Sequence, residues 1–217
     1  MNKQAVKFVV VVAAVMVCLM IYALGRGSQR GTVAFHEALD EVVAIVDGDE
    51  LLVRDVAFYV AYEEGLVEYY AMIYDDENTG AFWNAFTNHT FFRTKAKQSV
   101  IEMAVHDAIF YESSRAEGIV LTKEEEQYAA DALTDFWSDL SDKQKKALGV
   151  TKEEIGETMR RIALAEKYQS YLAAFYEKEF EAYSYTGEAY LKLLEEHDYE
   201  EGEIWQRIKF GGVTLNH

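Results

Sequence analysis

The longest amphipathic pattern in the chain lies between Phe91 and Glu126. Its apolar residues recur at steps of four, four, four, four and three, which places them along one stripe of an α-helix of roughly two dozen residues. Gly118 is expected to end this helix in a left-handed conformation. Thr122 and Glu125 then form the capping box of a second, acidic helix. The stripe comprises Phe92, Ala96, Val100, Ala104, Ala108 and Tyr111, and Ile101, Val105 and Ile109 widen it.

A hairpin and a helix are predicted before this central helix. Asp47-Gly48 stands between two apolar runs, which is a strong signal for a two-residue turn. Asp55 is placed to cap the helix that follows. The predicted elements are strands at about Ala44–Val46 and Glu50–Val53, a helix from Val56 to about Tyr74, a loop at Asp75–Gly80 and a short helical turn at Ala81–Phe86.

Two further capping boxes organise the second half of the chain. They pair Ser141 with Gln144 and Thr151 with Glu154. The alternating run Glu203–Phe210 is predicted to be a strand that pairs with the hairpin and joins the two ends of the body. The predicted helices run from Thr122 to about Asp139, from Ser141 to Gly149, from Lys152 to about Phe180 and from Gly187 to about His197.

The N-terminal run Val6–Leu24 is apolar over nineteen positions apart from one lysine. A transmembrane helix needs about 20 such residues, and Lys3 and Lys7 supply the positive flank that stays in the cytoplasm. We therefore expect a membrane anchor with the acidic body outside the cytoplasm. The alternative is secretion after cleavage near Gly25. Cys18 lacks the small preceding residue that a lipid attachment site needs.

The predicted fold class is mainly α, with a small two- or three-stranded β element. The chain divides into an anchor or signal at residues 1–25, a linker at 26–40 and a helical domain at 41–217. Proline is absent, which favours long uninterrupted helices. The net charge is −17, and all 38 acidic residues follow position 30. Because phosphate backbones repel such a body, no nucleic-acid partner is expected.

Four features occur in a recognisable order. They are the apolar N-terminus followed by the run VAIVDGDELL at 43–52, a helix opening at Asp55 with the later segment AEGIVLTKEEE at 116–126, a long helix after Thr151, and AYLKLL at 189–194. Together these features resemble the N-terminal chaperone domain of the SurA/PrsA family of extracytoplasmic foldases, over about residues 41–210. The resemblance implies a domain that binds unfolded or partly folded polypeptides outside the cytoplasm.

The parvulin isomerase domain of that family is missing from the sequence. Arg207 stands where the first parvulin strand has a histidine, and only seven residues follow Phe210. The resemblance therefore implies binding without proline isomerisation, so the protein is not expected to be an enzyme and no catalytic residue is proposed.

No motif for a cofactor is present, and no cofactor or metal is expected. Glu102 and His106 are four residues apart on the central helix, but no third ligand stands nearby. We interpret them as an ordinary pair on the helix surface. The oxygen-rich run Asp75–Asn78 lacks the twelve-residue calcium-loop pattern and is interpreted as a solvated turn.

The aromatic residues exceed what a core of this size is expected to absorb. Ten of them fall between Tyr59 and Phe92, and a second group lies at 168–176. Tyrosine and tryptophan suit a binding surface because an apolar ring carries a polar group. The candidates for client binding are Tyr69, Tyr70, Trp83 and Phe86, beside the loop at residues 75–80.

The leading hypothesis is a membrane-anchored, extracytoplasmic, chaperone-like protein whose partners are unfolded polypeptide clients. Three rivals stay open. One is a scaffold or assembly factor that binds one dedicated partner in the cell envelope. The others are an enzyme with dispersed catalytic residues, and a degenerate foldase that has lost both isomerase activity and client binding. Promiscuous binding of unrelated clients separates the first rival from the leading hypothesis.

Overall fold

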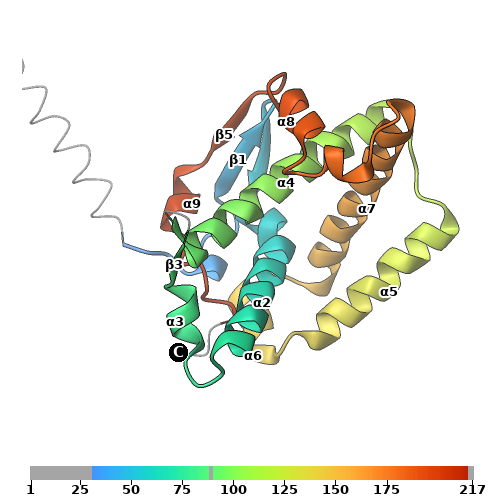
Figure 1. Cartoon of the computed structure of the whole chain (residues 1–217). Helices are drawn as coiled ribbons and strands as arrows, with labels where there is room; N and C mark the ends of the chain where they lie inside the picture. The colour runs from blue at the N-terminus through green and yellow to red at the C-terminus, as the bar shows by residue number, and fades with distance from the viewer. Residues whose placement is uncertain (1–30, 88–89, 215–217) are drawn as a thin grey trace, which may run out of the picture. The chain divides into compact units, whose positions relative to one another are not determined.

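The central helix of the fold is α4 (Phe92–Ala116), as the apolar stripe predicts. The computed structural model describes residues 31–87 and 90–214. In it α4 packs against α7 (Lys152–Phe175), α2 (Ala57–Tyr74) and the first strand of the sheet (Figure 1). Three sides of α4 are therefore covered. Its buried residues are Ala96, Val100, Ile101, Ala104, Val105, His106, Ile109, Phe110 and Ser114.

The predicted helix end at Gly118 and the three capping boxes are confirmed, but the prediction that Asp55 caps α2 is wrong. The N-cap of α2 is Val56, and the Asp55 carboxylate accepts the Leu52 N–H instead. Gly118 follows α4 with φ of 68°, and Gly149 follows α6 with φ of 71°, a region that glycine enters without a Cβ penalty. The three predicted capping boxes form at the starts of α5 (Lys123–Asp139), α6 (Asp142–Leu148) and α7. Each box satisfies backbone donors that a helix start leaves unpaired.

The sheet has three antiparallel strands in the order β2-β1-β5. The predicted hairpin is confirmed as β1 (Val42–Val46) and β2 (Asp49–Leu52), and its turn residues Asp47 and Gly48 have φ of 51° and 90°. Positive φ at both turn positions matches the right-handed twist of the strands. The coarse prediction of a mainly helical fold with a small sheet is thus confirmed among the residues described.

The third strand is β5 (Tyr199–Glu201), and the prediction of a strand at Glu203–Phe210 is wrong. That run begins instead as α9 (Glu203–Arg207). Trp205 and Ile208 are both buried, and their three-residue spacing fits one face of a helical turn better than one face of a strand. β5 itself carries little apolar alternation, so the pattern gave no signal for it.

Shorter elements complete the domain. α7 ends at Phe175, five residues earlier than predicted, and Glu177 turns the chain with φ of 51°. The predicted helical turn at Ala81–Phe86 lies earlier, as α3, and Phe86 begins a strand. The shorter elements of the domain are η1 (Phe35–Glu37), η2 (Val53–Val56), α3 (Thr79–Trp83), β3 (Phe86–Thr87), β4 (Thr90–Phe91), η3 (Phe180–Tyr183) and α8 (Glu188–Leu194).

The helical body begins earlier than the predicted boundary at residue 41. Residues 34–217 form one compact unit, and Phe35 and Ala38 are buried within it. η1 packs against the end of α6, where a Cβ on Gly149 would lie 2.7 Å from that of His36. The last part of the predicted linker therefore belongs to the body.

The predicted membrane anchor, Val6–Leu24, lies outside the part of the chain that the structure describes. Within residues 31–87 and 90–214, no helix is both long and apolar enough to span a bilayer.

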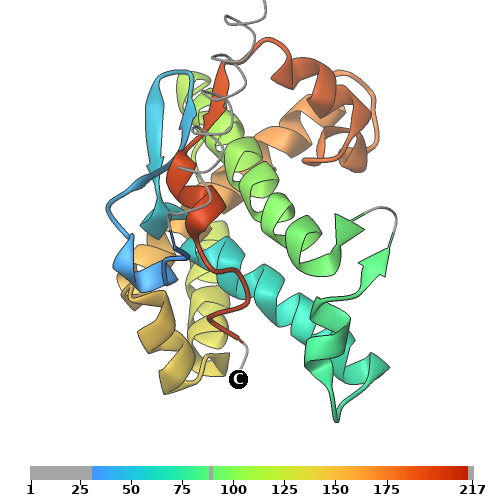
Figure 2. The same cartoon turned by 90° about the vertical axis from the view of Figure 1, so that its left-hand side faces the viewer.

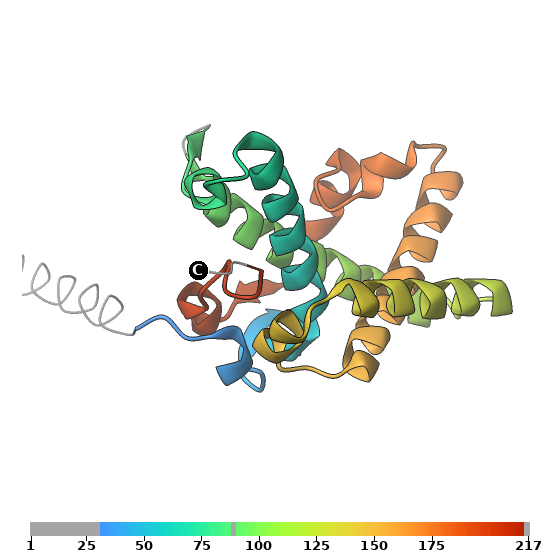
Figure 3. The ribbon, with the colours of Figure 1, turned by 90° about the horizontal axis from the view of Figure 1, so that it is seen from below.

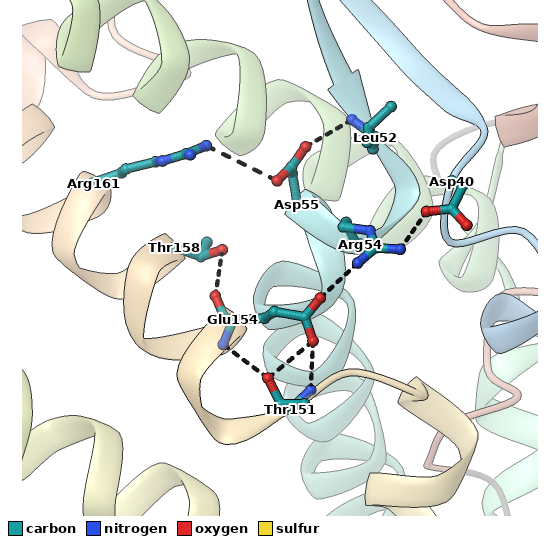
Figure 4. Close-up of polar contacts among 8 residues, drawn as sticks. All are labelled: Asp40, Leu52, Arg54, Asp55, Thr151, Glu154, Thr158 and Arg161. Carbon is teal, nitrogen blue, oxygen red and sulfur yellow. Dashed lines mark hydrogen bonds and ion pairs between the residues drawn. The ribbon is translucent and has the colours of Figure 1, made fainter.

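The start of α7 is fixed by the contacts shown in Figure 4. The Thr151 hydroxyl accepts the Glu154 N–H, and a Glu154 carboxylate oxygen accepts the Thr151 N–H at 2.8 Å. The other carboxylate oxygen accepts from Arg54 at 2.7 Å, and Arg54 also contacts Asp40. Several contacts hold the pKa of Glu154 below its usual value, and the hydrogen bond from the Thr151 backbone N–H has the largest effect.

Removing this cap is expected to destabilise the fold modestly. Thr151→Ala should lower the free energy of unfolding by about 1 kcal/mol, because the Glu154 N–H loses its acceptor. Urea unfolding followed by tryptophan fluorescence measures the loss. Ser170→Ala, at an exposed position of the same helix, is the control and should stay within about 0.5 kcal/mol of wild type. Equal losses in both variants would contradict the assigned role of the cap.

Candidate functional site

The second half of α2 exposes a set of large apolar side chains. Tyr69, Tyr70, Ile73 and Tyr74 are each at least half exposed. Scattered exposed hydrophobic residues are normal, whereas a contiguous group of them is typical of an interaction site. The surface formed by these side chains together with Phe86 and Phe91 is called the aromatic surface below.

Helical spacing explains why these side chains of α2 share one face. Residues three and four positions apart are neighbours on a helix, as Tyr69 is to Ile73 and Tyr70 is to Tyr74. Tyr62, seven positions before Tyr69, continues the same face and is also half exposed. The opposite face is buried and includes Val60, Val67 and Ala71. α2 is therefore apolar on both faces, but only one of them reaches the core.

The β3–β4 hairpin extends the aromatic surface beyond α2. The rings of Phe86 and Phe91 pack edge to face with centroids 5.1 Å apart. A row of ring contacts joins this region to α2, from Tyr74 to Phe82 at 5.7 Å and from Phe82 to Phe92 at 4.4 Å. Figure 2 shows α3 and the hairpin together beside the end of α2. Figures 1 and 3 show them on the opposite side of α2 from α7.

Trp83 does not belong to the exposed surface, and the expectation that it would is wrong. Its side chain is fully buried. The indole N–H donates to the Glu68 carboxylate at 2.7 Å, and the ring lies 6.1 Å from that of Phe210. Trp83 therefore packs beneath the aromatic surface and holds α3 to α2. Of the four sequence candidates, Tyr69, Tyr70 and Phe86 are exposed.

Ile73, Tyr74 and Phe91 are not among the candidates predicted from the sequence. The sequence does contain a signal for the two residues of α2. Apolar residues continue at steps of four, from Tyr69 to Ile73 and from Tyr70 to Tyr74. The same helix already has another apolar stripe for the core, so this second stripe indicates an exposed apolar face. Phe91 could be recognised only through its contact with Phe86, which depends on a hairpin of two-residue strands.

A second exposed aromatic group lies at the end of α7. Tyr171, Phe175 and Tyr176 are exposed, and their neighbouring rings lie 6.0 Å and 4.8 Å apart. Tyr176 also contacts the buried Tyr183 of η3. This group consists of three side chains, whereas the aromatic surface consists of six.

A polar cavity of about 550 Å³ lies among the β1–β2 hairpin, α4 and α7. The volume lies in the usual range for small-ligand pockets. Several of its polar groups are engaged with one another. Tyr59 donates to Asp107 at 2.8 Å, and Asp55 accepts the Leu52 N–H at 2.8 Å while facing Arg161 at 3.9 Å (Figure 4). We therefore place the candidate function on the aromatic surface.

His106 is buried, so its interpretation as a surface residue is wrong. One ring nitrogen lies 2.7 Å from an Asp107 carboxylate oxygen and the other lies 2.9 Å from the Tyr183 carbonyl oxygen. Both nitrogens are thus engaged in contacts between elements. In the described ranges, no group of three or more His, Cys, Asp or Glu side chains is arranged to hold a metal ion.

Comparisons with known proteins gave no relative. A scan against protein-family models found no matching family, and searches of curated proteins and of solved structures found no match.

Proposed function

We propose that this protein binds apolar segments of unfolded or partly folded polypeptides through the aromatic surface, without catalysis. It would act as a membrane-anchored, chaperone-like protein outside the cytoplasm. The exposed face of α2 with Phe86 and Phe91 is the observation that carries the proposal. Anchoring through Val6–Leu24 and the extracytoplasmic location are part of the proposal and rest on the sequence.

Two physical features support this function. Tyrosine and phenylalanine rings offer large apolar area with only two side-chain torsions to immobilise, so binding them costs little entropy. Few directional donors are needed, so unrelated sequences can bind to the same rings. Trp83 is buried beneath these rings, and its N–H donates to Glu68, which connects α3 to α2. The resemblance to SurA/PrsA chaperone domains supports the same function.

The test uses the fragment 31–217, which contains every core residue that the structure places as buried. After circular dichroism confirms helical structure, the fragment is mixed at stoichiometric ratios with two unrelated chemically unfolded proteins, and light scattering follows their aggregation. Suppression of both is expected. The triple variant Tyr69→Ala, Tyr70→Ala and Phe86→Ala should lose most of this suppression, because it removes three exposed rings without opening the core.

The matched control changes three exposed apolar residues elsewhere, as Val120→Ala, Tyr128→Ala and Leu191→Ala. It should suppress aggregation as well as wild type does. If the wild-type fragment is folded but suppresses the aggregation of neither client, the proposed function is wrong. The rival function, a scaffold with one dedicated envelope partner, would then be favoured. Suppression that survives the triple variant would reject the aromatic surface and direct attention to Tyr171, Phe175 and Tyr176.

A further inference from the structure

The elements that form the aromatic surface carry charged side chains of one sign. From Asp55 to Phe92 the sequence contains seven acidic residues and no lysine or arginine. This stretch supplies all of α2, α3 and the hairpin, and therefore every residue of the aromatic surface. Glu63 and Glu64 are buried, and Asp55 faces Arg161. The carboxylates that lie beside the aromatic surface are therefore those of Glu68, which binds Trp83, and of the loop at residues 75–77.

Three acidic residues lie directly after the last tyrosine of α2. Asp75 is half-buried and its carboxylate accepts the N–H groups of Glu77 and Asn78, which shapes the loop. Asp76 and Glu77 are exposed. Their charges are therefore free to act on a ligand that lies against Tyr70 and Tyr74.

The cations that come next in the sequence are Arg93, Lys95 and Lys97, in the first two turns of α4. Arg93 lies over the Trp83 ring at 5.8 Å. The Lys97 ammonium donates to the carbonyl oxygens of Gln206 and Ile208. Lys95 is exposed, but it lies on α4 among Thr90, Thr94 and Gln98. None of these groups neutralises the loop at residues 75–77 in the structure.

Aromatic rings and carboxylates attract the same ligand charge. The face of a tyrosine ring is electrostatically negative and binds lysine or arginine, most strongly where water is excluded. Exposed carboxylates add a longer-range attraction that salt weakens. A bound segment gains from both when apolar and basic side chains alternate along it, and a segment rich in acidic residues is repelled.

We propose that the aromatic surface selects cationic apolar polypeptide segments, in which aromatic or aliphatic residues alternate with lysine or arginine. This inference rests on the proposed function and narrows its clients to one chemical class. The apolar side chains contact the rings, and the basic side chains lie over ring faces or toward Asp76 and Glu77.

The experiment compares three fluorescent peptides of equal length and identical apolar residues. Their intervening positions are all lysine, all glutamine or all glutamate. Fluorescence anisotropy measures binding to the fragment 31–217 at 50 mM and 500 mM salt. At low salt, we expect the lysine peptide to bind on the order of tenfold more tightly than the glutamine peptide and the glutamate peptide to bind more weakly than both. At high salt the three affinities should converge.

A charge variant with a matched control tests the named carboxylates. Asp76→Asn with Glu77→Gln should reduce the preference for lysine several-fold while leaving the affinity for the glutamine peptide unchanged. Glu195→Gln with Glu196→Gln removes the same charge from another exposed site and should keep the preference. An equal loss in both variants would assign the preference to net charge and overturn the proposed role of Asp76 and Glu77.

The remaining outcomes separate this inference from the proposed function. Equal affinity for all three peptides would overturn charge selection while the proposed function stands. Absence of any binding would overturn both. Residues 1–30 are themselves apolar and carry four basic residues, so they are a competing occupant. If the full chain in lipid nanodiscs binds no peptide while the fragment with empty nanodiscs does, the surface serves the chain's own N-terminus and the proposal fails.

Discussion

His106→Leu is expected to lower the free energy of unfolding by about 2–5 kcal/mol, because two buried hydrogen-bonding groups lose their partner at about 1–3 kcal/mol each. The ring lies between an Asp107 carboxylate oxygen at 2.7 Å and the Tyr183 carbonyl oxygen at 2.9 Å. Leucine has the bulk of an imidazole but no nitrogen, so it would leave the Asp107 carboxyl group and the Tyr183 carbonyl without these contacts.

The position of His106 makes this loss large. Asp107 also accepts from the buried Tyr59 hydroxyl at 2.8 Å, so the group joins α4 to α2 on one side and to η3 on the other. The ring packs against Phe110 and Tyr190, with centroids 4.4 Å and 4.6 Å away. Water therefore has little room to replace the lost donor, and the penalty of the unpaired groups is not relieved.

The chain offers a matched control in His197. It pairs with Asp47 at 2.6 Å in the same way, but this pair is partly exposed. Exposed ion pairs contribute about 0–1 kcal/mol, so His197→Leu should cost no more than that. Urea unfolding of both variants at pH 7 measures the difference. Similar losses in the two variants would contradict the stabilising role assigned to the buried contacts of His106.

The parts of the fold that the sequence predicted are those determined by neighbouring residues. Each capping box needs only two side chains three positions apart, and the Asp47-Gly48 turn needs only a tolerance for positive φ. These interactions form inside one turn of chain. Distant residues therefore cannot override them easily, and all were predicted at the correct positions.

The parts that were mispredicted depend on contacts between distant segments. Trp83 is buried because Glu68 binds its N–H and Phe210, far along the chain, packs against its ring. Without that contact the tryptophan would resemble its exposed neighbours Tyr74 and Phe86. The run at 203–210 has apolar residues that satisfy both the helical and the strand period, and only packing decides between them. The exposure of the aromatic surface has the same origin, since sequence alone does not tell which apolar face of α2 meets the core.

Glu64 is a further residue whose role only the fold reveals. It is fully buried, and its carboxylate accepts the backbone N–H groups of Gly211, Val213 and Thr214 at 2.6, 2.9 and 2.7 Å. Burial raises the pKa of Glu64 to about 7, against the opposing effect of these donors. The same segment contains Phe210, which packs on Trp83, so Glu64 helps to hold the support of the aromatic surface in place.

The raised pKa gives the stability a defined pH dependence. The folded protein retains the Glu64 proton up to about pH 7, whereas the unfolded chain releases it near the ordinary glutamate pKa of 4.5. The stabilising contribution is therefore fully present below pH 4.5 and is lost as the pH rises through about 7. Between pH 5 and pH 8 the wild type should lose about 2–3 kcal/mol relative to Glu64→Gln, which cannot titrate at this position.

Urea unfolding of wild type and Glu64→Gln at several pH values between 5 and 8 tests this expectation. Every other titrating group is present in both proteins, so the change in their difference reports Glu64 alone. A difference in stability that stays constant with pH would mean that the three N–H donors outweigh burial and keep Glu64 ionised throughout. In that case the segment at 210–214 would support Trp83 equally well at every pH in this range.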